Sequence, residues 1–341
     1  MTVREIAELA GVSIGTVDRV LYKRGRVSAV TKAKIETIIE RYQFTPNPIA
    51  RRLKRNRAYH FCALLPQRDQ DAGYWSQILT GIEEAATEIA PLGVEMEIIE
   101  FDRYSQEKFQ AAAAAILEKK PDGLIFSPIM PGRISSFIEG IRQIGIPCIF
   151  IDAKLPGADP LCTIGQDSFR GGYLAGRLMH LFAGKITKPV AILDLHGEDY
   201  HIVQRRDGFL RYAGEQGFPS LVQEYSSYLG TEISVEEISR FLRENPDLTG
   251  IFVTNSMAHR VAQAAKERKK PRDFLLIGYD LVPNNRLFLE EGWIDVIISQ
   301  RPESQGREAL LNLYRRIVLE QQIPQKVEIP LDMYLKENIP V

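Results

Sequence analysis

Ser13 lies between Gly11 and Gly15, in the G-x-S-x-G spacing that presents a nucleophilic serine in many hydrolases. That chemistry needs a strand before the serine and a helix after it. Here the preceding residues 3–10 have the apolar spacing of a helix. We therefore interpret Ser13 as a helix N-cap and predict no catalytic residue and no enzyme activity from this motif.

A second pattern, His196-Gly-Glu-Asp-Tyr-His201, contains side-chain types that ligate zinc. It follows a predicted strand and lacks the helical register that directs two histidines at one ion. We expect a loop at the mouth of a cleft, with Tyr200 or His201 near a ligand, and no metal site. No G-x-G-x-x-G follows a strand, so no dinucleotide is predicted, and we expect no cofactor.

The residues around Ser13 predict two short helices joined by a tight turn. Gly11 follows the first helix and suits the left-handed conformation that ends one. The second helix of such a helix-turn-helix enters the DNA major groove. A third helix is predicted over residues 31–44, and the two short helices have apolar faces made of Ile6, Leu9 and Ala10 and of Val17, Val20 and Leu21.

The charge distribution supports DNA binding by the N-terminal region. The whole chain has 43 basic and 44 acidic residues. Residues 1–57, however, hold 13 Lys and Arg against 5 Asp and Glu, whereas the remainder is acidic. A basic head on an acidic body is typical of a polyanion-binding domain attached to another domain.

From Tyr59 onward, apolar runs of strand length alternate with helical patterns. The order recurs in a second half of similar length, which predicts two doubly wound α/β lobes with parallel sheets. Such folds bind ligands at the carboxyl ends of their strands and in clefts between lobes. The predicted strands include His60–Leu65, Val94–Phe101, Gly123–Ser127, Cys148–Ile151, Val190–Leu195, Leu221–Tyr225, Gly250–Thr254 and Phe274–Tyr279.

Other compositional features favour a cytoplasmic protein. No run of 18 apolar residues exists, and the N-terminus lacks the pattern of a signal peptide, so we expect no membrane contact. The cysteines Cys62, Cys148 and Cys162 lie in apolar segments without metal-ligand spacing. We expect buried, reduced thiols.

These motifs resemble the LacI/GalR family of transcription regulators over essentially the whole chain. Its head pattern, V-x-[DE]-[IV]-A-x-x-A-G-V-S-x-x-T-V-S-R-V-L followed by Y-x-P-N-x-x-A-R-x-L, recurs at residues 3–21 and 44–53. The resemblance implies a helix-turn-helix head and a sugar-sensing body like a periplasmic binding protein. It also implies a homodimer that binds a palindromic operator through the major groove and the central minor groove.

Within the head, the resemblance makes residues 13–20 the recognition helix. Asp18 departs from the serine usual in the family, and Ile14 and Gly15 offer no side-chain hydrogen bond to a base. In the hinge, Leu53 matches the residue that wedges between base pairs at the operator centre. The expected DNA-binding residues are Ser13, Ile14, Gly15, Thr16, Asp18, Arg19, Asn47, Ala50, Arg51, Leu53 and Lys54.

Within the body, the resemblance carries the family's cleft positions onto an aromatic pair, an arginine and several polar residues at strand ends. Ala153 departs from the polar residue of many relatives, and Lys154 is a candidate to compensate, so a sugar and a sugar phosphate both remain open as the effector. The expected ligand-binding residues are Tyr74, Trp75, Asp152, Arg205, Asn255, Asp280 and Gln300.

The combined expectation is a repressor whose operator affinity a carbohydrate controls. Two alternatives remain: a sugar-binding or sugar-processing protein with a non-regulatory DNA-binding head, and an architectural DNA binder without an effector. We expect a head at residues 1–45, a hinge helix and linker at 46–58, and an effector domain at 59–341. Its N-lobe comprises about 59–164 plus 296–324, and its C-lobe about 165–295 plus 325–341.

Overall fold

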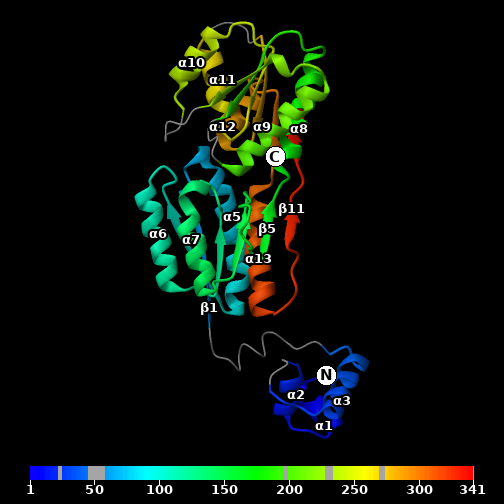
Figure 1. The fold of residues 1–341 in the computed structure, drawn as a ribbon. Helices are drawn as coiled ribbons and strands as arrows, with labels where there is room; N and C mark the ends of the chain where they lie inside the picture. Colours follow the sequence, from blue (N-terminus) through cyan, green and yellow to red (C-terminus); the bar gives the residue numbers. More distant parts are fainter. Residues whose placement is uncertain (22–24, 45–57, 195–198, 227–232, 269–272, 341) are drawn as a thin grey trace. The chain divides into compact units, whose positions relative to one another are not determined.

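The computed structural model describes residues 1–340 apart from 22–24, 45–57, 195–198, 227–232 and 269–272. The chain divides into two compact units, residues 1–57 and 58–341. The first is a small helical head, and the second is an α/β unit made of two lobes (Figure 1). None of the described helices has the length and apolar character needed to cross a membrane.

The head contains α1 (Val3–Ala10), α2 (Ile14–Leu21) and α3 (Ala29–Arg41). Gly11 ends α1 with φ 67°, and the Ser13 hydroxyl accepts from the Thr16 N–H at 3.2 Å, as the N-cap interpretation requires. Leu9 is 51% exposed, which corrects its expected place on the buried face of α1. Ala7 takes that place because residues 6, 7 and 10 share the helix face that meets α2 and α3. The buried apolar residues are Ile6, Ala7, Ala10, Val17, Val20 and Ile35.

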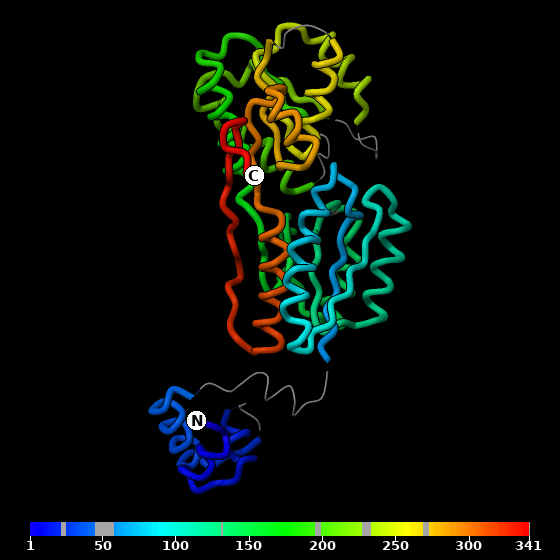
Figure 2. Tube along the Cα trace, turned by 180° about the vertical axis from the view of Figure 1, so that it is seen from behind, coloured from blue at the N-terminus to red at the C-terminus, as the bar shows by residue number. Residues whose placement is uncertain are grey.

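The N-lobe is a six-stranded parallel sheet in the order β11-β5-β4-β3-β1-β2. Helices α5 and α13 cover one face, and α6 and α7 cover the other (Figures 1 and 2). The strands are β1 (Tyr59–Pro66), β2 (Val94–Phe101), β3 (Gly123–Phe126), β4 (Cys148–Ile151), β5 (Cys162–Gly165) and β11 (Lys326–Glu328). The helices are α5 (Tyr74–Ile89), α6 (Gln106–Lys119), α7 (Pro131–Ile144) and α13 (Pro302–Leu313), which continues into a π-helical turn, Tyr314–Val318.

The C-lobe repeats this arrangement in the order β12-β10-β9-β8-β6-β7, with the edge strand β12 antiparallel to β10. Separate apolar clusters pack α8 and α9 against one side of the sheet and α10 and α11 against the other. The strands are β6 (Val190–Asp194), β7 (Val222–Ser226), β8 (Gly250–Val253), β9 (Leu275–Tyr279), β10 (Val296–Ser299) and β12 (Asp332–Tyr334). The helices are α8 (Ser168–Ala183), α9 (Tyr200–Glu215), α10 (Val235–Glu244), α11 (Ala258–Glu267) and α12 (Pro283–Glu290).

The chain crosses between the lobes three times: between β5 and α8, between β10 and α13, and between β11 and β12. Two of the expected lobe boundaries are therefore corrected. Residues 296–299 belong to the C-lobe, because β10 pairs with β9, and residues 326–328 belong to the N-lobe, because β11 pairs with β5. A short apolar run predicts a strand, but its sequence does not say which of two sheets it joins.

Glycines allow the closest helix contacts within each lobe. A Cβ on Gly81 of α5 would lie 1.9 Å from the Glu303 carbonyl oxygen of α13. In the C-lobe, a Cβ on Gly172 of α8 would lie 1.7 Å from the Arg205 carbonyl oxygen of α9. Figure 2 shows α5 and α13 running side by side. These contacts fix α13 and α9 close to their neighbours α5 and α8, and α5 and α9 carry residues of the cleft described below.

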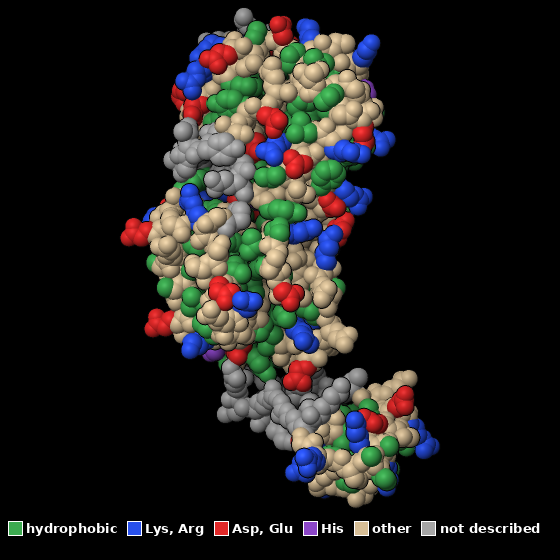
Figure 3. All heavy atoms as spheres, in the orientation of Figure 1, with side chains coloured by type: hydrophobic (Ala, Val, Ile, Leu, Met, Phe, Trp, Pro, Cys, Tyr) green, Lys and Arg blue, Asp and Glu red, His purple; other side chains and the backbone are tan. Residues whose placement is uncertain are grey.

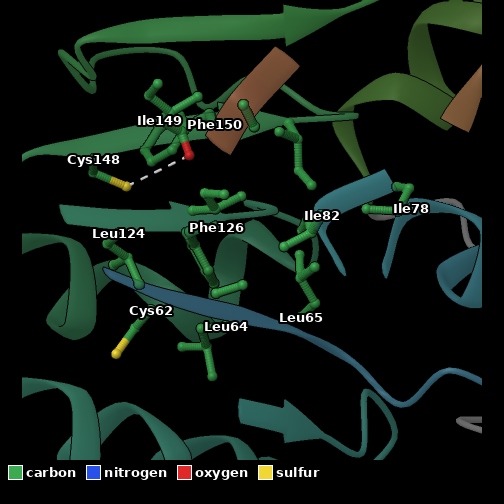
Figure 4. Packing of buried hydrophobic residues seen from close by; sticks show 14 of the residues in the cluster. Cys62, Leu64, Leu65, Ile78, Ile82, Leu124, Phe126, Cys148, Ile149 and Phe150 are labelled. Carbon is green, nitrogen blue, oxygen red and sulfur yellow. Dashed lines mark hydrogen bonds between the residues drawn. The ribbon is translucent and has the colours of Figure 1, made fainter. Parts of the chain in front are cut away.

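Apolar side chains fill the space between the N-lobe sheet and its helices. Figure 4 shows Leu64, Phe126 and Phe150 from neighbouring strands, with Ile78 and Ile82 of α5. The three cysteines are free and buried, and burial raises the pKa of the Cys148 thiol. Acidic and basic side chains are interspersed over the visible face of the two-lobed unit (Figure 3), without a large field of one sign.

Candidate ligand cleft and nucleic-acid interface

The second helix of the head presents the expected reading residues to solvent. Ser13, Ile14, Gly15 and Arg19 are exposed, while Thr16 and Asp18 are half-buried. Ser13 follows a helix rather than a strand, and its hydroxyl is used in capping α2, so it lacks the setting of a hydrolase nucleophile. The expected hinge contacts Asn47, Ala50, Arg51, Leu53 and Lys54 lie outside the described residues.

In the two-lobed unit, polar residues from both lobes converge on one cavity. Its volume is about 20 Å³, enough for about one water molecule, because the side chains themselves fill the cleft. A monosaccharide therefore enters only when the lobes or these side chains move. The lining residues are Asp71, Tyr74, Arg103, Asp152, Asp199, His201, Ile202, Arg205, Asn255, Ser256, Asp280 and Gln300.

Asp152 and Asp280 occupy corresponding places in the two lobes. Each directly follows the third strand in the order of its sheet, β4 and β9, and each has a left-handed backbone, with φ 65° and 61°. The Asp152 N–H donates to Ile164 O at 2.9 Å, and the Asp280 N–H donates to Ile298 O at 2.8 Å. Each backbone is thus held by the neighbouring strand while the chain turns at the sheet edge, so that the carboxylates face one cavity.

Burial dominates the electrostatics of these two carboxylates. Asp280 is 3% exposed, and burial, strengthened by the neighbouring charge of Asp152, raises its pKa to about 7 despite the opposing effect of Arg205. Burial also raises the pKa of Asp152, again against Arg205 and against the hydrogen bond from the Tyr74 hydroxyl at 2.7 Å. Gln300 Nε2 donates to Asp280 Oδ1 at 3.0 Å. Both acids therefore ionise more readily when a further donor or a cation reaches them.

Arg205 is 1% exposed and lies in the cleft, on α9. Its guanidinium stacks 3.7 Å above the Tyr279 ring and donates from Nη1 to Thr254 O at 2.8 Å. The Gln166 amide oxygen, oriented toward the guanidinium, accepts from Nη2 at 2.5 Å. These contacts hold the arginine in one orientation beside the two aspartates.

Asn255 and His201 line the same cavity with buried polar atoms. Asn255 Oδ1 accepts from the Met257 N–H at 3.2 Å, whereas its Nδ2 donates to no described group. His201 lies with Nε2 3.9 Å from Asp152 Oδ2, and its Nδ1 has no hydrogen-bond partner among the described residues. Burial, reinforced by Arg205, lowers the pKa of His201 to about 3, so its imidazole is neutral near pH 7. Both residues line the cavity, and each has one buried polar atom without a partner among the described residues.

A buried ion-pair network joins the lobes beside these residues, and sequence reasoning missed it. Arg103, two residues beyond β2, binds the carboxylate of Asp71 and donates from Nη2 to Asp199 Oδ2 at 2.6 Å. Asp199 belongs to the C-lobe, and its Oδ1 accepts from the Met130 N–H of the N-lobe at 2.7 Å. Ser256 adds a bond from the C-lobe to Asp71 O at 2.7 Å. A signal was present, because Arg103 follows a strand and Asp199 precedes a helix, but neither position reveals a partner in the other lobe.

The remaining expected ligand residues separate into two groups. Tyr74 lines the cavity, but Trp75 is 1% exposed in the N-lobe core, where its indole N–H donates to Asp71 Oδ2 at 2.6 Å. Gln300 lies at the second crossover, where Gln305 of α13 holds its backbone. Gln305 Nε2 donates to Gln300 O at 3.0 Å, and its Oε1 accepts from the Asp152 N–H at 3.0 Å. The crossover and the N-lobe site are thereby tied together.

The structure describes Lys154 and only part of the histidine-containing loop. Three or more His, Cys, Asp or Glu side chains suited to one metal ion do not occur together among the described residues. His196 and Glu198 of the histidine-containing loop lie outside the described residues. Lys154 is exposed and does not line the cavity, so it does not supply a cation there.

Comparisons with known proteins cover both units. Residues 2–47 match the family described as "Bacterial regulatory proteins, lacI family", and residues 62–320 match the "Periplasmic binding protein domain". The chain is 32% identical over 286 residues to the HTH-type transcriptional regulator DegA of Bacillus subtilis (strain 168), covering 82% of this chain and 81% of DegA. It is 28% identical over 338 residues to the HTH-type transcriptional repressor PurR of Photorhabdus laumondii, covering 96% and 94%.

The comparison of structures agrees with this result. A crystal structure from Bacteroides fragilis, of a protein classed as a LacI transcriptional regulator, superimposes with a TM-score of 0.77 at 30% identity. The superposition covers 83% of this chain and 98% of that one. Sequence and fold therefore point to the same group of proteins.

Proposed function

Because the chain belongs to the LacI family of bacterial regulatory proteins, we propose that it is a repressor whose affinity for a palindromic operator is controlled by a carbohydrate. As a member of this family it is a DNA-binding transcriptional regulator with a ligand-binding domain, and not an enzyme. The nature of the effector, the homodimer and the direction of the response belong to the proposal.

The observation that carries the effector proposal is the convergence of Asp152 and Asp280, from opposite lobes, on one cavity. Carboxylates accept hydrogen bonds from hydroxyls, and the amides of Asn255 and Gln300 in the same lining can both accept and donate them. An aromatic ring, here that of Tyr74, can pack against the C–H face of a sugar. A small ligand rich in hydroxyl groups satisfies this set of residues.

The head supports the DNA part of the proposal. Its exposed α2 offers Arg19 as a hydrogen-bond donor and Ile14 as an apolar contact for a thymine methyl. The expected hinge residues, with Leu53 as the minor-groove wedge, add contacts at the operator centre. Two heads in a homodimer would place two such helices in successive major grooves.

Control of operator affinity follows from the lobes' shared cleft. A carbohydrate that bridges Asp152 and Asp280 changes the balance between open and closed lobes, because it contacts both only when the cleft is closed around it. The coupling to DNA binding is typically about 1–3 kcal/mol. Within a dimer, this movement changes the spacing of the paired hinges and hence the fit to the operator.

The full-length protein provides the test. Operator sequences are selected from a random double-stranded DNA library, and the best fluorescent duplex is titrated with protein in the presence of single monosaccharides, their phosphates and their amino derivatives. We expect at least one compound to shift both the operator affinity and the melting temperature. If none shifts either, the carbohydrate part of the proposal is wrong and the architectural alternative is favoured. Turnover of a glycoside would favour the sugar-processing alternative.

A further inference from the structure

We propose that the effector is a polyhydroxylated amine, such as an amino sugar or an imino sugar, and not a sugar phosphate. This inference rests on the proposed function and names the chemistry of its effector. It is carried by the charges of the residues that line the cleft, by the partners that each charge already has, and by two buried polar atoms that lack a partner among the described residues.

Negative side chains outnumber positive ones in the cavity lining. Four aspartates face two arginines, and the one histidine there is neutral near pH 7. Burying a charge without an opposite charge is costly, so an excess of carboxylates favours a cationic ligand. The charged residues in question are Asp71, Asp152, Asp199, Asp280, Arg103 and Arg205.

Both arginines are already bound by protein groups. Arg103 holds the carboxylates of Asp71 and Asp199. Arg205 donates to Thr254 O and stacks on Tyr279. No lysine lines the cavity within the described part of the chain. A phosphate or carboxylate in the cleft would therefore meet carboxylates without finding an available cation.

Asp152 and Asp280, by contrast, have hydrogen bonds from neutral donors. Asp152 accepts from the Tyr74 hydroxyl, and Asp280 accepts from the Gln300 amide. Neither forms an ion pair with a lysine or arginine of the described residues, and the nearest basic atom, His201 Nε2, is 3.9 Å from Asp152. An ammonium group between the two carboxylates would supply the missing charge. Burial raises the pKa of both acids although Arg205 opposes the shift, so the one cation beside them does not compensate for the burial of two carboxyls.

Two buried polar atoms without a partner among the described residues indicate that the ligand forms hydrogen bonds in addition to ion pairs. Asn255 is 7% exposed and its Nδ2 donates to no described group, and His201 Nδ1 is likewise without a described partner. Buried polar atoms are nearly always hydrogen-bonded, so both indicate contacts to a ligand. Hydroxyl groups satisfy them, because each hydroxyl both donates and accepts. The ligand thus combines an ammonium group with hydroxyl groups.

The inference is tested by calorimetric titration of the full-length wild-type protein with matched sets of probes. Each set contains a hexose, its 2-amino-2-deoxy form, its N-acetylated amine and its 6-phosphate, and imino sugars are added with their neutral parents. We expect at least one amine to bind ten-fold or more tightly than its neutral and N-acetylated counterparts. Neutral or phosphorylated sugars that bind as tightly as the amines would overturn the inference and leave the proposed function intact. Absence of binding by every probe would overturn both.

Isosteric variants test whether the two cleft aspartates cause the preference for amines over neutral sugars. Asp152→Asn and Asp280→Asn each remove one negative charge with almost no change of shape, and we expect each to reduce the ratio of amine to neutral-sugar affinity about ten-fold. Asp159→Asn, an exposed change in the same lobe as Asp152, is the matched control and should leave the ratio unchanged. An unchanged ratio in both cleft variants would contradict the assignment. The wild-type titration decides independently of whether the variants fold.

Discussion

Asp199 of the C-lobe accepts a hydrogen bond at 2.7 Å from the backbone N–H of Met130 in the N-lobe, while its second oxygen accepts from Arg103. This buried carboxylate is thus one of the groups that join the two lobes at the cleft, together with the hydrogen bond from Ser256 to Asp71 O. Movement of the lobes requires this carboxylate to exchange its partners for water. The strength of its contacts therefore contributes to the free energy difference between open and closed forms.

We predict that Asp199→Asn weakens effector binding about ten-fold. The amide oxygen can still accept from Met130, but the charge that pairs with Arg103 is lost, at a cost of about 1–3 kcal/mol. Affinity for the best carbohydrate probe, measured by calorimetry, checks this. Asp207→Asn on α9, the helix that Asp199 precedes, is the control, because Asp207 pairs with Arg206 at the surface. Equal affinities for Asp199→Asn and wild type would show that the contact between lobes does not contribute to the closed form.

We predict that Gly172→Ala destabilises the two-lobed unit by about 1–3 kcal/mol or more, because the new Cβ would collide with the Arg205 carbonyl. The same displacement moves the guanidinium of Arg205, so effector affinity should fall as well. Urea unfolding and calorimetry measure the two effects. Gly214→Ala on α9, where no atom lies within 4 Å of the added Cβ, should be neutral or slightly stabilising. A fully stable Gly172→Ala protein would contradict the helix contact described.

We predict that the protein loses stability relative to Asp280→Asn as pH rises from about 4 to about 7. Because burial raises the pKa of Asp280 to about 7 in the folded protein, the folded state holds a proton there that the unfolded chain has released. The stability that this proton confers is complete at low pH and lost as pH rises through 7, on the order of a few kcal/mol. Urea unfolding at pH 5 and pH 7 compares the variants. The groups that act on the pKa of Asp280 include Arg205, Asp152, Gln300 and Asp71. A difference that is independent of pH would show that Asp280 ionises normally in the folded protein.

We predict that Arg19→Ala weakens binding to the selected operator by about 1–3 kcal/mol, with a smaller effect on random DNA. Arg19 is exposed in the last turn of α2, where it can reach a base edge. Fluorescence anisotropy at several salt concentrations measures both affinities. Arg4→Ala on α1, which removes an exposed partner of Glu8, serves as the control. Equal losses on operator and random DNA, with a shallower salt dependence, would assign Arg19 to a phosphate contact.

The sequence predicted the bounds of strands more reliably than it predicted which strands pair with each other. Apolar runs located β2 and β4 with correct bounds, because a buried parallel strand is almost continuously apolar. It did not predict that 296–299 joins the C-lobe sheet, since strand pairing depends on contacts far apart in the chain. Trp75 and Leu9 show a related limit. Helical spacing alone does not determine which residues at the margin of an apolar helix face are buried in the core.

The cleft residues likewise fall into those that the sequence predicted and those that it did not. Strand-end positions correctly brought Asp152, Asn255, Asp280 and Gln300 together at one cavity, since the carboxyl ends of parallel strands share an edge. The ion pairs of Arg103 were missed, because its two partners come from different lobes and lie 32 and 96 positions away. Charge pairing over such separations leaves no local pattern in a single sequence.

The three crossovers also have a consequence for biosynthesis. The N-lobe begins at β1 but takes its edge strand from β11, residues 326–328, and its covering helix from α13. A nascent chain that has emerged only as far as β5 therefore exposes an unpaired strand edge and the apolar side of α5. Folding of this lobe has to wait for the C-lobe to be synthesised in between, and the incomplete lobe is the stage at which chaperones would be needed.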